Sequence, residues 1–221
     1  MEYRVDEKIY GSLPQLDTTA RYIAILSVFA TLGNNKTKLE ETLCQALEAG
    51  CSAACLKELF LQLLAYVGFP RAINALDILQ EVLVQKYGEN MPLMPATPAT
   101  EAPKRAALGS QELALVNQVQ EAFLRQKYQS FSPELVDFII DFAYGDLYGR
   151  PYLGKIYREV GIIASIVTLG HSFGQLEFHI SAGLVLNLSP AAVKEIIAIA
   201  AKESSLANGE LGLQVLAKIT G

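Results

Sequence analysis

Three side chains that can carry protons lie close together in the second half of the sequence. His171 and His179 are the only histidines of the chain, and Glu159 precedes them. Carboxylates and imidazoles can act as general acids and bases near neutral pH. Because this set occurs in one half only, it indicates a single working site per chain.

Both histidines also have structural explanations, which stay open. His171 can cap the turn that follows Gly170, and His179 can be a core histidine whose hydrogen bonds are satisfied internally. A metal site is not expected. If both histidines lie on one helix, eight residues separate them by about 12 Å, whereas the ligands of one ion lie within a few ångström of each other.

The three cysteines do not have the spacing of a dithiol site. Cys44, Cys51 and Cys55 are seven and four residues apart, unlike the C-x-x-C of a redox centre. We expect them to be small buried hydrophobic side chains. An odd, sparse cysteine count also suits a reducing cytoplasm, which is the predicted location.

Helices are expected throughout, because apolar residues recur every three or four positions and no segment alternates like a strand. Four of the nine prolines fall within residues 92–103, so we interpret residues 88–109 as a linker without helix. An acidic run at Asp137, Asp141 and Asp146 is expected on a solvated helix face. Expected helices span residues 52–67, 70–87, 110–129 and 132–144, and a capping box at Thr37 opens another.

An internal repeat relates the two halves. A shift of 137 residues places residues 21–64 over 158–201 without a gap, and 12 of these 44 positions are identical. Gly50 then lies over Asn187, and both residue types tolerate a left-handed helix stop. The ionisable set is not repeated: the first half has Tyr22, Asn34 and Thr42 at the positions of Glu159, His171 and His179.

Composition excludes several classes of protein. Hydrophobic residues make up 51% of the 221 residues and the net charge is −5, which predicts a globular chain with a sizeable core. No Lys/Arg-rich run suggests a nucleic-acid partner. The longest uncharged apolar stretches, residues 22–33 and 160–170, are shorter than the roughly 20 residues of a membrane-spanning helix. The polar start of the sequence predicts no signal peptide.

Several short motifs in this order resemble the carboxymuconolactone decarboxylase family, within the alkylhydroperoxidase D-like superfamily. The resemblance covers about residues 8–85 and 133–218. The motifs are Arg158-Glu159, Leu169-Gly170-His171, Gln175-Leu176-x-x-His179 and Tyr66-x-Gly68-x-Pro70-x-Ala72-x-x-Ala75. The resemblance implies an all-α fold, here a duplicated alkylhydroperoxidase D-like helical unit. The first repeat would be residues 1–87 and the second, with the candidate site, residues 110–221.

The resemblance also implies an activity and a set of site residues. It suggests a lyase that uses no cofactor and acts by acid–base chemistry on a small anionic lactone or related acid. It further implies a ring-like homo-oligomer, a trimer of two-repeat chains. The implied catalytic residues are Glu159, His179 and His171, and the implied substrate-binding residues are Arg158, Tyr66 and Phe69. Glu159 and His179 would be the proton-transferring pair, and we predict that their polar atoms meet in a mostly apolar pocket.

Two other functions remain open. The alkylhydroperoxidase branch of the superfamily uses a C-x-x-C dithiol, whose positions fall near His171 and Gly174 here. The absence of both cysteines argues against a peroxiredoxin-type antioxidant activity. The loss of the ionisable set from the first repeat is compatible with a non-catalytic, oligomeric binding protein.

Overall fold

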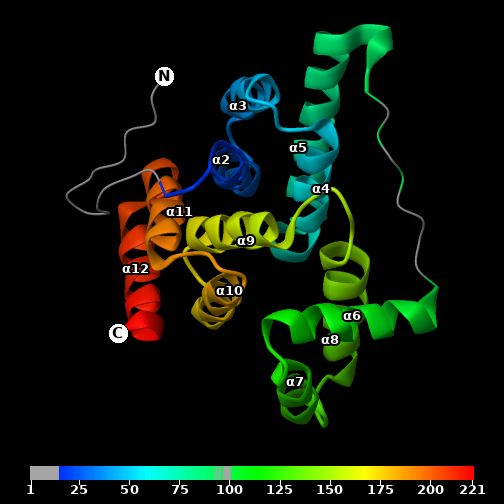
Figure 1. The fold of residues 1–221 in the computed structure, drawn as a ribbon, viewed down its shortest axis with the longest axis vertical. Helices are drawn as coiled ribbons and strands as arrows, with labels where there is room; N and C mark the ends of the chain where they lie inside the picture. The colour runs from blue at the N-terminus through cyan, green and yellow to red at the C-terminus, as the bar shows by residue number, and fades with distance from the viewer. Residues whose placement is uncertain (1–14, 93, 95, 97–100) are drawn as a thin grey trace.

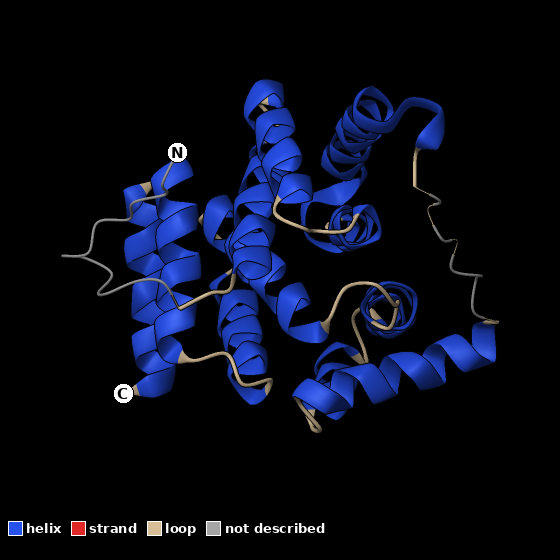
Figure 2. Ribbon diagram, turned by 45° about the horizontal axis from the view of Figure 1, so that its top comes forward, coloured by secondary structure: helices blue, strands red, loops and turns tan. Residues whose placement is uncertain are grey.

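The computed structural model describes residues 15–92, 94, 96 and 101–221. Helices account for the regular structure of these residues, and no strand occurs among them (Figure 2). The predicted all-α class is therefore confirmed. The expectations for the start of the chain, and for linker residues 93, 95 and 97–100, lie outside the described residues.

Within the described residues, four helices form the first half and four form the end of the chain (Figure 1). The first group comprises α2 (Thr18–Leu32), α3 (Lys36–Glu48), α4 (Ala53–Gln62) and α5 (Leu64–Tyr87), followed by the 3₁₀ turn η1 (Gly88–Asn90). The last group comprises α9 (Lys155–Leu169), α10 (Phe173–Val185), α11 (Pro190–Glu203) and α12 (Leu206–Thr220). Adding 137 to the limits of α2 and α3 gives the limits of α9 and α10.

Matching residues stop and start the helices in both groups. Gly50 and Asn187 have φ values of 97° and 72°, the left-handed conformation in which glycine and asparagine are favoured. Two residues later, Ser52 and Ser189 cap α4 and α11 by accepting a backbone N–H at 3.1 and 3.0 Å. The predicted left-handed stop is confirmed at both positions, and the same serine cap follows it in each group.

Helices α2 and α9 pack against each other along the centre of the fold (Figure 1). Their contact is close because Gly161 has no side chain. A Cβ atom at this position would lie 2.8 Å from Leu59 Cδ1 and 3.0 Å from Ser27 Oγ. Both helices are almost completely buried on the facing sides, including Ile23 and Ile162, so most of the apolar core lies around this crossing.

Two ion pairs, each with a buried glutamate, cross between the halves. Arg21 Nη2 lies 2.9 Å from Glu195 Oε1, and Arg158 Nη2 lies 3.8 Å from Glu58 Oε2. Arg21 and Arg158 are equivalent under the 137-residue shift, as are Glu58 and Glu195. Each arginine therefore reaches the glutamate of the other half, a reciprocal arrangement typical of a two-fold contact.

A separate group of helices fills the middle of the sequence. It comprises α6 (Ala102–Val116), α7 (Gln120–Tyr128), α8 (Pro133–Asp137) and the π-helix η2 (Phe138–Tyr148). Helix α6 lies directly against η2. Glycine permits the approach on both sides: a Cβ atom on Gly109 would overlap the carbonyl oxygen of Ile140, and one on Gly145 would lie 2.6 Å from the carbonyl oxygen of Arg105.

Three local expectations are wrong. Helix α6 begins at Ala102, inside the stretch interpreted as a linker, because Pro103 falls in its first turn, where a missing N–H costs little. The helix expected over 110–129 is interrupted after Val116, where Asn117 is extended and its side chain accepts the N–H of Val119. The N-cap of α3 is Asn35, whose side chain accepts from Lys38 N at 3.0 Å, and not Thr37.

The α6–η2 contact predicts a sharp contrast between two glycines. Gly109→Ala should lower the free energy of unfolding by about 2 kcal/mol or more, since the backbone of Ile140 has to move. Gly174→Ala, in α10, is the control, because its Cβ would meet nothing within 4 Å. It should be neutral or stabilising by up to about 1 kcal/mol. Urea unfolding monitored by circular dichroism measures both, and equal stabilities would contradict the close contact.

Candidate active site

Glu159 and His179 meet inside the second half of the fold. Helix α10 packs on α9, and this places His179 Nδ1 2.9 Å from Glu159 Oε2. The glutamate side chain is fully buried, whereas 7% of the histidine side chain is exposed. The predicted contact between their polar atoms is therefore present, and the imidazole is the member of the pair that reaches the surface.

Tyr148 completes the hydrogen bonding of the carboxylate. Its hydroxyl donates to Glu159 Oε1 at 2.8 Å, so each oxygen of Glu159 has a partner. With Glu159 ionised, both oxygens accept, and the proton of the imidazole is on Nδ1. Nε2 of His179 is then the ring nitrogen free of this network, available to exchange a proton with another molecule.

Aromatic rings enclose the imidazole. The rings of Tyr66 and Phe178 lie edge-on to that of His179, with centroid separations of 5.3 and 5.1 Å. Tyr144 packs against Tyr148 at 5.3 Å. Because Tyr66 lies on α5, the site combines side chains from both halves of the chain.

Burial keeps the surrounding tyrosines neutral. Desolvation, with Glu159 nearby, raises the pKa of Tyr66 and Tyr144 well above the ordinary value, and that of Tyr148 also rises. Each phenol therefore keeps its proton throughout the physiological range. Tyr148 remains a hydrogen-bond donor to the carboxylate, which stabilises the charge on Glu159.

A kink in α5 separates Tyr66 from the rest of that helix. Gly68 has a φ of 79°, which glycine adopts without penalty, and Pro70 follows in the next turn. Tyr66 lies before the kink, against His179. Phe69 lies at the kink and is 59% exposed, so the structure does not bring it into the cluster around Glu159.

His171 is also separate from the pair. It lies in the turn between α9 and α10, exposed, with Nδ1 2.7 Å from Ser172 Oγ. Eight residues separate it from His179, about 12 Å along a helix. The structure therefore places His171 at a turn, as the structural interpretation of the sequence allowed, and gives it no contact with the Glu159 carboxylate.

Arg158 is committed to internal partners. Its guanidinium donates to Gln62 Oε1 at 3.0 Å and to the carbonyl oxygen of Arg150 at 2.9 Å, and the residue is completely buried. Burial lowers the pKa of Arg158, and the carboxylate of Glu58 opposes this effect. Arg158 thus fixes the start of α9 beside Glu159 and has no surface to offer a substrate.

Glu58 connects the start of α9 to the end of η2. Arg150 donates to both of its carboxylate oxygens, at 2.7 and 3.0 Å, the bidentate geometry that makes such pairs strong. Arg150 follows Tyr148 by two residues. The ion pair therefore positions the segment that carries the Tyr148 hydroxyl onto Glu159.

The equivalent location in the first half has lost these groups. Tyr22 replaces the glutamate, and Thr42 replaces the histidine and donates to the carbonyl oxygen of its own helix residue Lys38 at 2.7 Å. At the position equivalent to Tyr66, Glu203 binds Lys38 Nζ at 2.9 Å. Asn34 stands in place of His171. The Lys38–Glu203 ion pair therefore lies where the site of the second half has aromatic rings.

The cysteines are unpaired, and two of them are buried. Desolvation raises the pKa of Cys51, and it raises that of Cys55 to about 11. A thiol with a raised pKa is a poor nucleophile at neutral pH. Among the described residues, no group of three or more His, Cys, Asp or Glu side chains could hold a metal ion.

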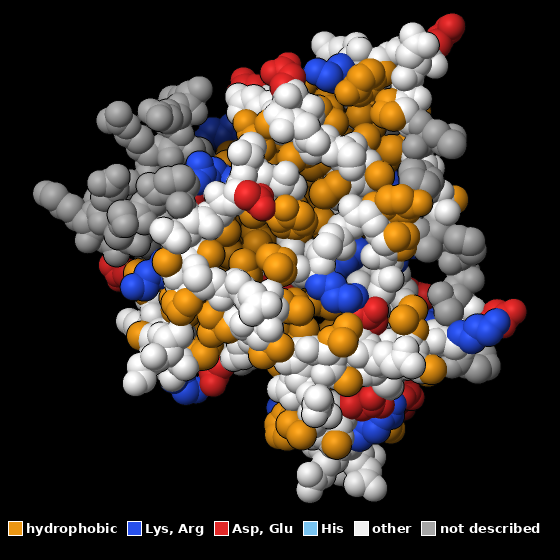
Figure 3. Space-filling model, viewed as in Figure 1, with side chains coloured by type: hydrophobic (Ala, Val, Ile, Leu, Met, Phe, Trp, Pro, Cys, Tyr) orange, Lys and Arg blue, Asp and Glu red, His pale blue; other side chains and the backbone are white. Residues whose placement is uncertain are grey.

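No protein-family model matches the chain, and no curated protein matches its sequence. In the described part of the chain, every helix is too short or too polar to cross a membrane. The face shown in Figure 3 carries acidic and basic side chains interspersed among hydrophobic ones.

Sequence reasoning missed Tyr148 and the Glu58–Arg150 pair. The sequence pattern singled out the acidic run at residues 137–146 and gave no role to Tyr144 and Tyr148, which are buried. A π-helix turns them inward, and such helices are frequent at functional sites. The signal for Glu58 was available, because Arg21, Glu58 and their counterparts are identical in the repeat.

The raised thiol pKa values predict slow alkylation. In the folded protein at pH 8, Cys51 and Cys55 should react with iodoacetamide far more slowly than Cys44, which is half-buried. The thiolate fraction of Cys55 should rise only as the pH approaches about 11. Mass spectrometry of timed samples measures this, with the urea-unfolded chain as control. Peroxide consumption that depends on any cysteine would revive the peroxidase interpretation.

Proposed function

We propose that the chain is a carboxymuconolactone decarboxylase-like enzyme that acts by cofactor-free acid–base chemistry on a small anionic lactone or related acid. The observation that carries the proposal is the buried Glu159–His179 hydrogen bond, with Tyr148 on the second carboxylate oxygen. The motif residue Tyr66 supports it, since its ring packs on His179 from the other half of the chain.

His179 is the catalytic residue of this proposal. When a carboxylate leaves as CO₂, the carbon–carbon bond breaks and its electron pair stays on the remaining molecule, which must then take up a proton. The imidazolium of His179 donates that proton from Nε2 and is reprotonated from water. General acid catalysis of this kind contributes about 10²–10⁴-fold in rate.

Glu159 acts as a positioning residue. Its carboxylate is fully buried and both oxygens are occupied, so it orients the imidazole without touching the substrate. This division of labour differs from the sequence expectation, in which both residues exchange protons directly. Tyr148 holds the carboxylate in place.

We further propose that the two groups of four helices are copies of one duplicated alkylhydroperoxidase D-like unit and that the chains form a trimer. Coincident helix limits and the reciprocal Arg–Glu pairs support the duplication. Exposed aromatic side chains, including Phe131, Phe138 and Phe69, support further association, because monomers seldom leave so many uncovered.

The trimer is tested by mass. Light scattering of the purified chain should give about three times the 24.1 kDa of one chain, because burial of the exposed aromatic side chains stabilises the assembly. The mass should persist in high salt, which weakens exposed charge pairs but not apolar contacts. A mass near 24 kDa at micromolar concentration would contradict the assembly.

A non-catalytic binding protein is the second candidate function. The small exposed fraction of His179 favours it, as does the replacement of the ionisable residues in the first half. In that case the Glu159–His179 pair would only stabilise packing, and substitutions there would change stability without a matching change in any rate.

A substitution series distinguishes the two functions. With carboxymuconolactone as the first substrate tested and CO₂ release as the readout, His179→Ala should lower kcat by about 10²–10⁴-fold. Tyr148→Phe should cause a smaller loss, because it removes one hydrogen bond from Glu159. The matched control is Thr42→Ala, at the equivalent position of the first half, which should leave kcat nearly unchanged.

Unfolding curves accompany the kinetics. His179→Ala should keep a cooperative transition, so that lost turnover is separated from lost structure. Equal kcat losses in His179→Ala and Thr42→Ala would contradict the assignment of the site to the second half. An unchanged kcat in His179→Ala would assign that residue to packing.

A further inference from the structure

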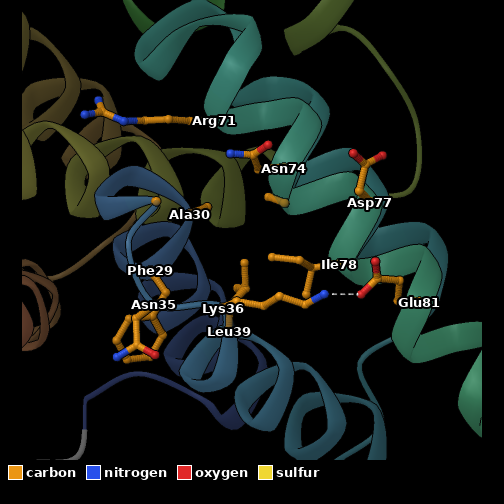
Figure 4. Close-up of a pocket in the computed structure, with 12 residues that line it drawn as sticks. Phe29, Ala30, Asn35, Lys36, Leu39, Arg71, Asn74, Asp77, Ile78 and Glu81 are labelled. Atoms are coloured by element: carbon orange, nitrogen blue, oxygen red, sulfur yellow. Dashed lines mark hydrogen bonds and ion pairs between the residues drawn. The ribbon is translucent and has the colours of Figure 1, made fainter.

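A pocket of about 270 Å³ lies in the first half, between α5 and the turn that joins α2 to α3 (Figure 4). It does not include Glu159 or His179. Apolar side chains form part of its lining, among them Phe29, Leu39 and Ile78. Its rim carries the charged and polar side chains of both elements.

Negative charge is in excess at one end of the pocket. Lys36 Nζ lies 2.5 Å from Glu81 Oε2 and 3.6 Å from Glu40 Oε1. The dashed line in Figure 4 marks the first of these contacts. Lys36 is therefore engaged by two carboxylates, and this end offers no free positive charge to a ligand.

Arg71 supplies an unmatched positive charge at the other end. The structure records no hydrogen bond or ion pair for it among the described residues. Its side-chain stem lies over Gly33, where a Cβ atom would be 3.5 Å from Arg71 Cγ. The arginine side chain therefore lies across Gly33 at this helix end and lines the pocket.

We propose that this pocket binds a small monocarboxylate with an apolar tail, independently of the proposed enzymatic activity. The guanidinium of Arg71 would receive the carboxylate, since its planar donors match that group. Asn74, one turn further along α5, lines the same pocket and adds an amide donor. The apolar tail would lie against Phe29 and Ile78.

Size and charge restrict the ligand further. The pocket volume of about 270 Å³ lies at the lower end of the roughly 300–1,000 Å³ that is typical of small-molecule sites, which favours a small ligand. Hexanoate, with about eight non-hydrogen atoms, is of this size. A second carboxylate on the ligand would meet Asp77 and the Glu81 end of the pocket and would be repelled. A monocarboxylate is therefore preferred over a dicarboxylate.

The equivalent place in the second half has an asparagine instead of the arginine. Asn208 is equivalent to Arg71, and Gly170 to Gly33. The amide of Asn208 lies so close to Gly170 that a Cβ atom there would overlap it, and it donates to the carbonyl oxygen of Thr168 at 3.2 Å. The fold thus accepts asparagine at this position, but uses it internally.

Titration calorimetry with hexanoate tests the proposal, using the full chain. We expect saturable binding of hexanoate, at least tenfold weaker binding of the uncharged hexanamide, and at least tenfold weaker binding of the dicarboxylate adipate. Arg71→Asn, which installs the residue of the second half, should weaken hexanoate binding at least tenfold. Lys104→Asn is the control, since it removes an exposed cation from α6, and should leave binding unchanged.

Two further measurements secure the interpretation. Arg71→Gln keeps part of the stem over Gly33 and replaces Arg71→Asn if the latter fails to fold. Amide NMR shifts on hexanoate addition should centre on Gly33, Asn35 and Ala75. The proposal is overturned if hexanoate does not bind, if hexanamide or adipate binds equally well, or if both Arg71 variants bind like the parent.

A His179→Ala variant separates this site from the proposed active site. Hexanoate should bind it as tightly as the parent chain, whatever happens to turnover. Loss of binding in this variant, with binding retained in the Arg71 variants, would place the carboxylate at the Glu159–His179 pair and overturn the assignment to the first half.

Discussion

The close crossing of α2 and α9 is the constraint on which the remaining structure depends. Gly161 lets the two helices approach, and an arginine on each reaches a buried glutamate of the other half. Buried charges are tolerated only when they are paired and hydrogen-bonded, because desolvation would otherwise cost several kcal/mol. The crossing therefore has one well-defined geometry, which fixes the positions of the elements joined to either helix.

The candidate site lies next to this crossing. Arg158 and Glu159 are neighbours on α9, and their side chains make different contacts. Arg158 joins the ion-pair network with Glu58, while Glu159 turns to His179 and Tyr148. Since Arg150 binds the same Glu58, the network also fixes the end of η2. The ion pairs of the buried Glu58 therefore fix the two segments that carry Glu159 and its hydrogen-bond partner Tyr148.

The two halves have matching helix ends but different side chains at equivalent positions. The stops at Gly50 and Asn187 are matched, as are the serine caps that follow them. The proton-carrying residues occur only in the second half. The first half instead has the pocket under Arg71, whose counterpart Asn208 is engaged with its own backbone. Packing strongly restricts how the helices are arranged, whereas the side chains at their edges can differ between the halves.

Sequence alone determined the helical class, the left-handed stops and the pairing of Glu159 with His179. These follow from local periodicity, capping and spacing along two adjacent helices. It did not determine the role of Arg158, the exposure of Phe69 or the separation of His171, nor did it find Tyr148 and the pocket at Arg71. Each of these depends on which segments distant in sequence pack together, and on the inward turn of a π-helix. Burial and partner choice are properties of that packing, so only the tertiary structure decided them.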